Sequence, residues 1–273
     1  DPNGGLMKAV ARAWFWRGAE TLGAMAAKPA ARLLDEMGFL AVVLGSAGLI
    51  VRGQWRFLFG HTVQQIYFTA VQRAYLFTVV GSIIGALMAF PLIVFRIHDP
   101  ALLGRIMHIM MYHQLNPILA ALFVTGLSGS AITAELGEIK ANQAIDHLAA
   151  MGVDPHGFFV LPRLFGMILS LPILTCWLNV GVTVGAAAML DIYQNVPLPI
   201  FLGVCASGLS YPSLALTGAM VVTQAIHIIL VQSSRAFRVR AYVDIPRALP
   251  GAFAQSFVGC LIVSLLFSLI RYG

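Results

Sequence analysis

A serine and a histidine in apolar sequence are the residues whose types could support covalent catalysis. Ser128 lies in the sequence Gly126-Leu127-Ser128-Gly129, and His227 follows in a later apolar stretch. A histidine that accepts the serine proton makes the hydroxyl a nucleophile, so an intramembrane hydrolase is one hypothesis. The structural alternative is that Ser128 and Ser130 bond to backbone where two membrane helices touch, because glycine and serine are common there.

A second polar group lies between two apolar stretches and predicts an amphipathic helix over residues 135–151. Its acidic and amide side chains recur at helical spacing and form one stripe: Glu135, Glu138, Asn142 and Asp146. Gly152 is expected to cap this helix, and Pro155 prevents its continuation. Such a helix can dock on a partner or lie on a bilayer surface, and a cytoplasmic loop that is merely helical is the alternative.

Other chemistries find little support in the residues. No Gly-Lys pair occurs, so the chain lacks the phosphate-binding loop of an ATPase. The 3 cysteines lie far apart in apolar sequence, which predicts neither a disulfide framework nor a metal site. A polar group near residue 110 has poor metal-ligand spacing and is interpreted as interfacial or subunit-contact residues: His108, His113, Gln114 and Asn116. We therefore predict no catalytic residue and no cofactor, and any driving ATPase must be another chain.

The composition indicates which kind of scaffold positions these residues. Of the 273 residues, 59% are hydrophobic and only 10% are charged. Soluble domains carry about a quarter charged residues, so the chain is predicted to be an all-α polytopic membrane protein. The net charge of +6 does not indicate nucleic-acid binding, because the basic residues flank apolar stretches as they do in membrane proteins.

Five stretches are long and apolar enough to cross a bilayer: 74–95, 113–134, 164–190, 212–234 and 248–270. The first and third carry GxxxG spacings, at Gly81 and Gly85 and at Gly181 and Gly185, which allow close helix approach in lipid. Residues 197–207 are assigned to an outer-face helix or loop. Residues 37–51 are too short to cross and are assigned to a shallow or interfacial segment, and residues 61–73 are polar enough to lie at the interface.

Lysine and arginine set the predicted orientation. A cytoplasmic N-terminus leaves only Arg96, Arg105 and Arg271 of the 17 basic residues outside, and places the C-terminus outside. Residues 6–31 combine basic and aromatic side chains and predict an interfacial helix at the cytoplasmic leaflet. The expected organisation is thus an N-terminal interfacial region over residues 1–73 and a five-helix domain over residues 74–273, with a coupling helix over residues 135–152.

The sequence GSAITAELGEIKANQAIDHLAAMGVDP, which ends at Pro155, resembles the central motif of the MlaE/YrbE permeases, the membrane subunits of MCE-type lipid ABC transporters. The resemblance extends from about Tyr75 to the C-terminus. It implies a bacterial inner-membrane permease that dimerises and moves phospholipid between the inner membrane and the outer membrane or periplasmic side. It also implies a cytoplasmic ABC ATPase, an MCE-domain protein on the periplasmic side and, in some systems, a STAS-domain subunit.

The resemblance also implies roles for individual residues. The coupling helix would dock the ATPase through a set of charged and apolar side chains: Glu135, Glu138, Lys140, Asp146, Leu148, Met151 and Asp154. The outer half of the first span would line a lipid cavity between two permease copies through Leu87, Phe90, Leu92 and Ile93.

The chain departs from the family pattern at three places, and each change removes charge or polarity. The usual Arg-Glu-Leu-Gly-Pro reads His-Gln-Leu-Asn-Pro over residues 113–117, and Pro91 replaces a typical glutamine. The usual Gly-Arg-x-Gly is Gly-Leu-Ser-Gly over residues 126–129, which is also the motif around the serine of rhomboid intramembrane proteases. A rhomboid-like protease using Ser128 and His227, and a non-ABC lipid-binding scaffold, remain the alternative hypotheses.

Overall fold

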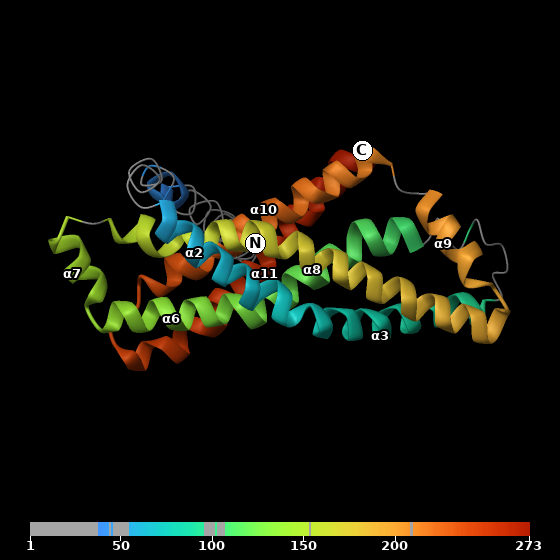
Figure 1. The fold of residues 1–273 in the computed structure, drawn as a ribbon, viewed down its shortest axis with the longest axis horizontal. Coiled ribbons are helices and arrows are strands. Elements are labelled where there is room, and N and C mark those ends of the chain that lie inside the picture. Colours follow the sequence, from blue (N-terminus) through green and yellow to red (C-terminus); the bar gives the residue numbers. More distant parts are fainter. Residues whose placement is uncertain are drawn as a thin grey trace, which may run out of the picture.

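The computed structural model describes residues 38–43, 45, 55–95, 102, 107–152, 154–207 and 210–273. These residues form helices and turns and contain no strand. Five helical segments are long and apolar enough to cross a membrane, which confirms the predicted all-α polytopic fold: Leu58–Pro91, Met111–Ala141, Pro155–Gln194, Tyr211–Ala236 and Tyr242–Tyr272. The helices lie along one axis, with α7 at one end and α9 at the other (Figure 1). We call these the α7 end and the α9 end.

The first span is longer than the sequence predicts. Helix α2 (Trp55–Ile66), the π-helical η1 (Tyr67–Val71) and α3 (Gln72–Val94) follow one another without a break. Residues 61–73 therefore belong to the spanning helix instead of a separate interfacial segment. Their polar groups find partners along the way, since Gln65 Nε2 donates to Thr69 Oγ1 at 3.0 Å and Thr62 Oγ1 donates to the Pro162 carbonyl at 3.5 Å.

The second span is also an unbroken helical stretch. It comprises η2 (Met107–Leu115), α5 (Asn116–Val124), η3 (Thr125–Gly129) and α6 (Ser130–Ala141), of which η2 and η3 are π-helical. The short helix α7 (Ala144–Ala150) follows after a turn. Single π-helical turns insert an extra residue without ending a helix and are frequent at functional sites.

The third span is α8 (Pro155–Gln194), a helix of 40 residues. Asp154 caps it by accepting a hydrogen bond from the His156 backbone at 3.0 Å, and Pro155 occupies the first turn, where proline is well tolerated. The helix ends at Asn195, whose φ of 53° lies in the left-handed region.

Helices α3 and α8 touch through the two predicted GxxxG pairs. A Cβ built on Gly85 would lie 2.1 Å from the Val182 carbonyl oxygen, and one on Gly185 would lie 1.9 Å from that of Ser82. A Cβ on Gly181 would lie 2.3 Å from the Thr78 carbonyl oxygen. Only glycine permits this backbone approach, so the two motifs form one contact, which we call the glycine seam.

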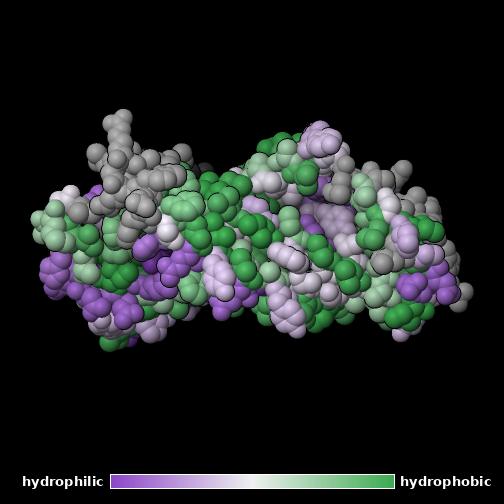
Figure 2. All heavy atoms as spheres, in the orientation of Figure 1, coloured by the Kyte–Doolittle hydropathy of each residue, from purple (hydrophilic) through white to green (hydrophobic). Residues whose placement is uncertain are grey.

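The chain continues through α9 (Leu198–Ser207), α10 (Tyr211–Ala236), the short 3₁₀ helix η4 (Tyr242–Asp244) and α11 (Ile245–Tyr272). Helix α9 corresponds to the outer-face segment expected at 197–207. The turn between α10 and α11 lies at the α7 end, because Gly137 of α6 faces Val239 and Ile245. Hydrophilic side chains gather at this end, beside a largely hydrophobic band (Figure 2).

Helix α8 lies at the centre of the bundle. Its leucines at 161, 171, 174, 178 and 190 have no exposed surface. By contrast, the apolar windows of the first and fifth spans are only 22% and 17% buried, against 56% for α8. The first and last spans therefore present most of their apolar surface outward.

Part of the expected shallow segment packs on the α7 end. Residues 38–43 are helical, and the Phe39 ring lies 5.5 Å from the His156 ring and 6.0 Å from the Phe237 ring, between centroids. The interfacial helix expected over residues 6–31, and Arg96 and Arg105, lie outside the described residues.

Candidate functional site

The expected single helix over residues 135–151 is wrong, because the structure divides it in two. Helix α6 ends at Ala141, Gln143 adopts a left-handed conformation with φ of 58°, and α7 begins at Ala144. Two contacts stabilise the turn. Tyr242 of η4 donates to the Asn142 side chain, and Lys140 Nζ lies 2.7 Å from Asp146 Oδ1.

The turn changes the polar stripe. Residues six apart fall on different faces of a straight helix, so Lys140 and Asp146 can meet only because the chain bends between them. Asp146 therefore pairs locally and does not extend the stripe of Glu135 and Glu138. Residues 135–152, which we call the coupling segment, form a bent element, and its second helix, α7, lies at one end of the molecule (Figure 1).

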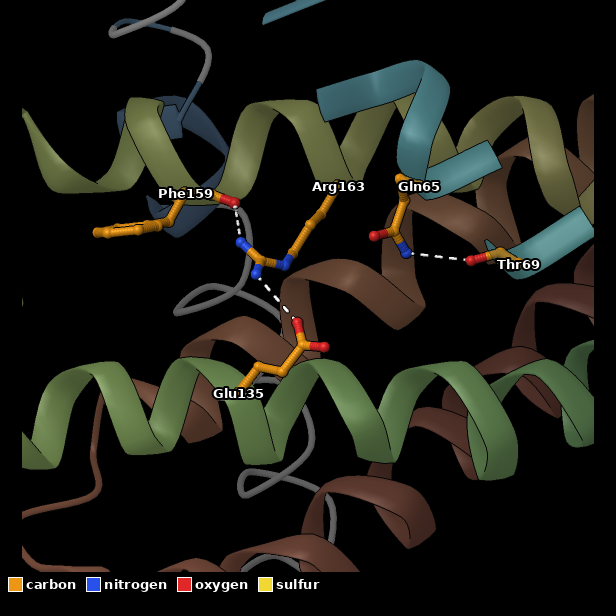
Figure 3. Close-up of polar contacts among 5 residues, drawn as sticks. All are labelled: Gln65, Thr69, Glu135, Phe159 and Arg163. Carbon is orange, nitrogen blue, oxygen red and sulfur yellow. Dashed lines mark hydrogen bonds and ion pairs between the residues drawn. The ribbon is translucent and has the colours of Figure 1, made fainter. Parts of the chain in front are cut away.

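An ion pair joins the base of this segment to α8. Glu135 Oε2 lies 3.1 Å from Arg163 Nη2, and Arg163 Nη1 donates to the Phe159 carbonyl at 2.8 Å (Figure 3). The Arg163 side chain is 18% exposed and the Glu135 side chain 60%. A cavity of about 270 Å³ adjoins the pair, and Gln65 of α2 belongs to its lining together with Glu135 and Arg163. Three helices of the bundle thus meet at the start of the coupling segment.

The remaining predicted docking residues divide into two groups. Asp154 caps α8, and Lys140 and Asp146 pair with each other, so these side chains stabilise the local fold. Glu138 is exposed, Leu148 is half-buried and Met151 is 72% exposed. Gly152 has a φ of 77°, as expected of the residue that ends α7. Glu138 and Met151 are therefore the side chains of the set most available to a partner.

The hydrogen bond that the structure gives Ser128 comes from an arginine and not from a base. Arg73 Nη1 of α3 donates to the Ser128 hydroxyl, and a guanidinium stays protonated in proteins and cannot take the serine proton. Ser130 donates to the Gly126 carbonyl, as the structural alternative expected. His227 packs against α11, where a Cβ on Gly259 would lie 1.8 Å from its Nε2. Sequence reasoning missed the role of Arg73, although it is the basic residue next to the first predicted span.

Two members of the polar group near residue 110 lie inside the protein. His113 is 3% exposed and Asn116 is fully buried within one chain, so these two are not subunit-contact residues, whereas His108 and Gln114 are half-buried. Their position at the membrane interface stays a prediction. His113 Nδ1 lies 2.7 Å from Thr217 Oγ1 of α10, and Asn116 donates to the Asn179 side chain of α8. Polar side chains within lipid-spanning segments pair with one another because lipid offers no partners.

The expected lipid-cavity wall lies on the outer half of α3. Leu87 and Phe90 are exposed and Ile93 is half-buried, and the Leu92 side chain lies outside the described residues. Nothing within the described bundle covers Leu87 and Phe90, which are 66% and 55% exposed.

Neutralising Glu135 is expected to affect stability little. The Glu135→Gln variant should lower the free energy of unfolding by less than about 1 kcal/mol, because an exposed ion pair is worth little in water. Arg163→Gln should cost more, because Arg163 is largely buried and also donates to Phe159. Thermal unfolding of the purified variants measures both changes, and a larger loss for Glu135→Gln than for Arg163→Gln would contradict this assignment.

Comparisons with known proteins give consistent similarities. A family model described as Permease MlaE matches residues 62–270. The chain is 29% identical over 163 residues to the intermembrane phospholipid transport system permease protein MlaE of Haemophilus influenzae, covering 59% of this chain and 61% of that protein. It is 27% identical over 100 residues to the chloroplastic protein TRIGALACTOSYLDIACYLGLYCEROL 1 of Arabidopsis thaliana, covering 37% and 29% of the two chains.

A probable ABC transporter permease protein of Synechocystis is 32% identical over 96 residues, covering 35% of this chain and 36% of that one. The aligned part of this chain thus spans less than two thirds of the length of each of these relatives.

Proposed function

This chain belongs to the MlaE permease family, and from that premise we propose that it is the membrane subunit of a lipid ABC transporter. In this proposal it moves phospholipid between the inner membrane and the periplasmic side, and a separate ATPase subunit supplies the energy. The observation that carries the proposal is the coupling segment, which joins two spanning helices and presents an exposed short helix beyond them.

The coupling segment has the mechanical connections that such a role needs. Helix α6 is the last part of the second span, which ends at Ala141. Only three residues separate the end of α7 from Asp154, which caps the third span. A displacement of α7 by a partner is therefore passed directly into two spans, while the pair of Glu135 and Arg163 holds α6 against α8. The sequence contains no phosphate-binding loop, so the ATPase would be another chain.

Charge supports a cytoplasmic α7 end. Both loops at this end carry basic residues: Lys140, Arg163, Arg235, Arg238, Arg240 and Arg247. Arg271 lies near the opposite end of the last span, and Arg96 and Arg105 are the other basic residues predicted on that side. By the positive-inside rule the protein is a multi-pass inner-membrane protein with a cytoplasmic N-terminus and a periplasmic C-terminus.

The outward apolar faces of α3 and α11 suit a second permease copy. Lipid would then lie between the copies against Leu87, Phe90, Leu92 and Ile93. An MCE-domain protein would cover the α9 end, and a STAS-domain subunit would join the ATPase at the α7 end. The names of the relatives support phospholipid transport and an ABC ATPase partner, and the exposed apolar surfaces of the first and last spans support a second copy.

Native mass spectrometry of the protein, extracted gently from its own membranes, tests the proposal. We expect a complex with two permease copies, an ATPase subunit and retained phospholipid. A lone copy that carries neither ATPase nor lipid would contradict it.

A further inference from the structure

A second apolar cavity, of about 340 Å³, lies at the α9 end. Four helices contribute to its lining, through Tyr112 and His113 of η2, Val180 of α8, Leu202 and Ala206 of α9, and Leu214 of α10. The surface is hollowed beside the N-terminal part of α10 (Figure 2). None of the α3 residues proposed to contact lipid between two copies contributes to this lining, so the cavity is a separate site.

One side of the cavity wall is a hydrogen-bond network around His113. The Thr217 hydroxyl donates to the Ser213 carbonyl at 3.0 Å, so the tautomer that fits is the one in which His113 Nδ1 donates to Thr217 Oγ1. His113 Nε2 then accepts through its single lone pair, and Ser213 Oγ and His108 Nε2, both 2.9 Å away, are the two candidate donors.

A second pair of hydrogen bonds lies on the opposite side of the wall. Thr183 Oγ1 donates to the Asn179 carbonyl at 2.7 Å, so the Tyr112 hydroxyl, 2.6 Å away, donates to Thr183. Between these two polar groups, most of the lining is apolar and includes Val180, Leu202 and Leu214. A cavity of this kind accepts a hydrocarbon chain.

A positive charge lies next to Thr217, which is one of the residues that line the cavity. Arg271 Nη2 donates to Thr217 Oγ1 at 2.7 Å and to the Ser213 carbonyl at 3.1 Å. Its Nε is buried and has no partner among the described residues. The two ion pairs with carboxylates that these residues form both lie at the α7 end, far from Arg271. An arginine without a carboxylate partner is suited to bind a phosphate oxygen.

We propose that this cavity binds one acyl chain of a phospholipid, with the lipid phosphate at Arg271. The inference rests on the proposed function, because it takes the ligand to be the transported class of molecule. Lipid tails are already in an apolar medium, so the chain gains close packing and no hydrophobic free energy by entering. The shape of the cavity and the phosphate contact would therefore determine which lipid the site retains.

A photoreactive phospholipid tests the chain-binding part. The probe is a phosphatidylglycerol with a diazirine at the end of one acyl chain, incorporated into nanodiscs with the purified protein. We expect cross-links on the α8 and α9 peptides that line the cavity. Val180→Trp should reduce them about tenfold, which corresponds to about 1.4 kcal/mol, because the indole fills the cavity.

Val184→Trp is the matched control, since Val184 lies one turn further along α8, is 55% exposed against 49% for Val180, and does not line the cavity. Ala206→Trp fills the cavity from α9 and should repeat the effect of Val180→Trp. Equal cross-linking in all three variants would overturn the proposal, as would cross-links confined to α3.

Removing the charge at residue 271 tests the head-group part. Arg271→Gln should weaken cross-linking of the phospholipid probe about tenfold, because a hydrogen bond to a charged group is lost, and should leave a diazirine fatty alcohol unaffected. Excess inorganic phosphate should not displace the phospholipid probe. Displacement by phosphate, or an equal loss for both probes, would show that no phospholipid spans the cavity and Arg271.

The results also separate this inference from the proposed function. If the complex transports lipid but Val180→Trp and Arg271→Gln bind the probes like the unmodified protein, only the cavity assignment fails. If the protein retains no lipid and transports none, the proposed function and the cavity assignment both fail.

Discussion

Replacing Gly185 with leucine is expected to abolish assembly of the folded protein, and alanine at the same position should destabilise it. The first atom of any side chain at 185 would lie 1.9 Å from the Ser82 carbonyl oxygen, which belongs to backbone and cannot rotate away. Overpacking a well-packed contact typically costs about 1–3 kcal/mol, more than the roughly 1 kcal/mol that alanine gains over glycine in helix propensity. Helices α3 and α8 must separate to admit the methyl group.

Gly218→Ala is the matched control for the glycine seam. Gly218 also lies within a spanning helix, α10, but a Cβ there would meet nothing within 4 Å. The thermal midpoint of unfolding in detergent and the monodisperse fraction after extraction measure the effect. Gly185→Ala should lower both values and Gly218→Ala should lower neither. An unchanged midpoint for Gly185→Ala would contradict the close packing of α3 on α8.

A charge placed at the end of α7 is expected to detach the ATPase and stop transport. Met151 is 72% exposed, so Met151→Glu should leave the fold of the permease intact. If Met151 is an apolar contact at the centre of the docking surface, its loss should cost about 2 kcal/mol or more, as interface hot spots do. Affinity would fall roughly thirtyfold, by the relation that 1.4 kcal/mol is a factor of ten. Glu138→Lys should act in the same direction.

Val243→Glu is the control for this docking prediction. Val243 lies in η4 at the same end of the molecule and is 69% exposed, but it belongs to the turn between α10 and α11. The ATPase that co-purifies with each variant should be lost with Met151→Glu and retained with Val243→Glu. Loss with Val243→Glu alone would place the docking surface on the other loop, and retention with both variants would remove α7 from the interface.

The number and order of the membrane spans could be predicted from sequence because lipid imposes simple requirements. A spanning helix needs a long apolar stretch, and prolines and charged residues separate such stretches. Four of the predicted stretches fall within the observed spans. The first differs because Gln65 and Thr69 satisfy each other within the helix, which lets the span begin well before Ala74.

The candidate site was harder to predict because its details depend on tertiary contacts. The bend at Gln143 is accompanied by a hydrogen bond to the Asn142 side chain from Tyr242, which is distant in sequence. The predicted stripe treated residues 135–151 as one helix and could not anticipate the pairing of Lys140 with Asp146. Periodicity therefore identified the segment, whereas its shape depended on the loop between α10 and α11.

The residue types around His113 also do not predict where these side chains lie in the structure. Histidine, glutamine and asparagine at the start of a span are equally compatible with a surface contact and with an internal network. Thr217, Ser213 and Arg271 come from the last two spans, so only the packed bundle shows that they complete a buried network with His113. The glycine seam was more predictable, because both GxxxG pairs could be found in sequence and only their partnership was missing.

The central claim is that this chain moves phospholipid when a partner hydrolyses ATP. The most direct measurement uses the complex purified from its own membranes and reconstituted in liposomes, with a fluorescent phospholipid whose removal from one leaflet is followed over time. We expect removal that requires ATP, stops with a non-hydrolysable analogue, and is lost in Met151→Glu but not in Val243→Glu. Removal at the same rate without nucleotide, or none in an intact complex that hydrolyses ATP, would contradict the account.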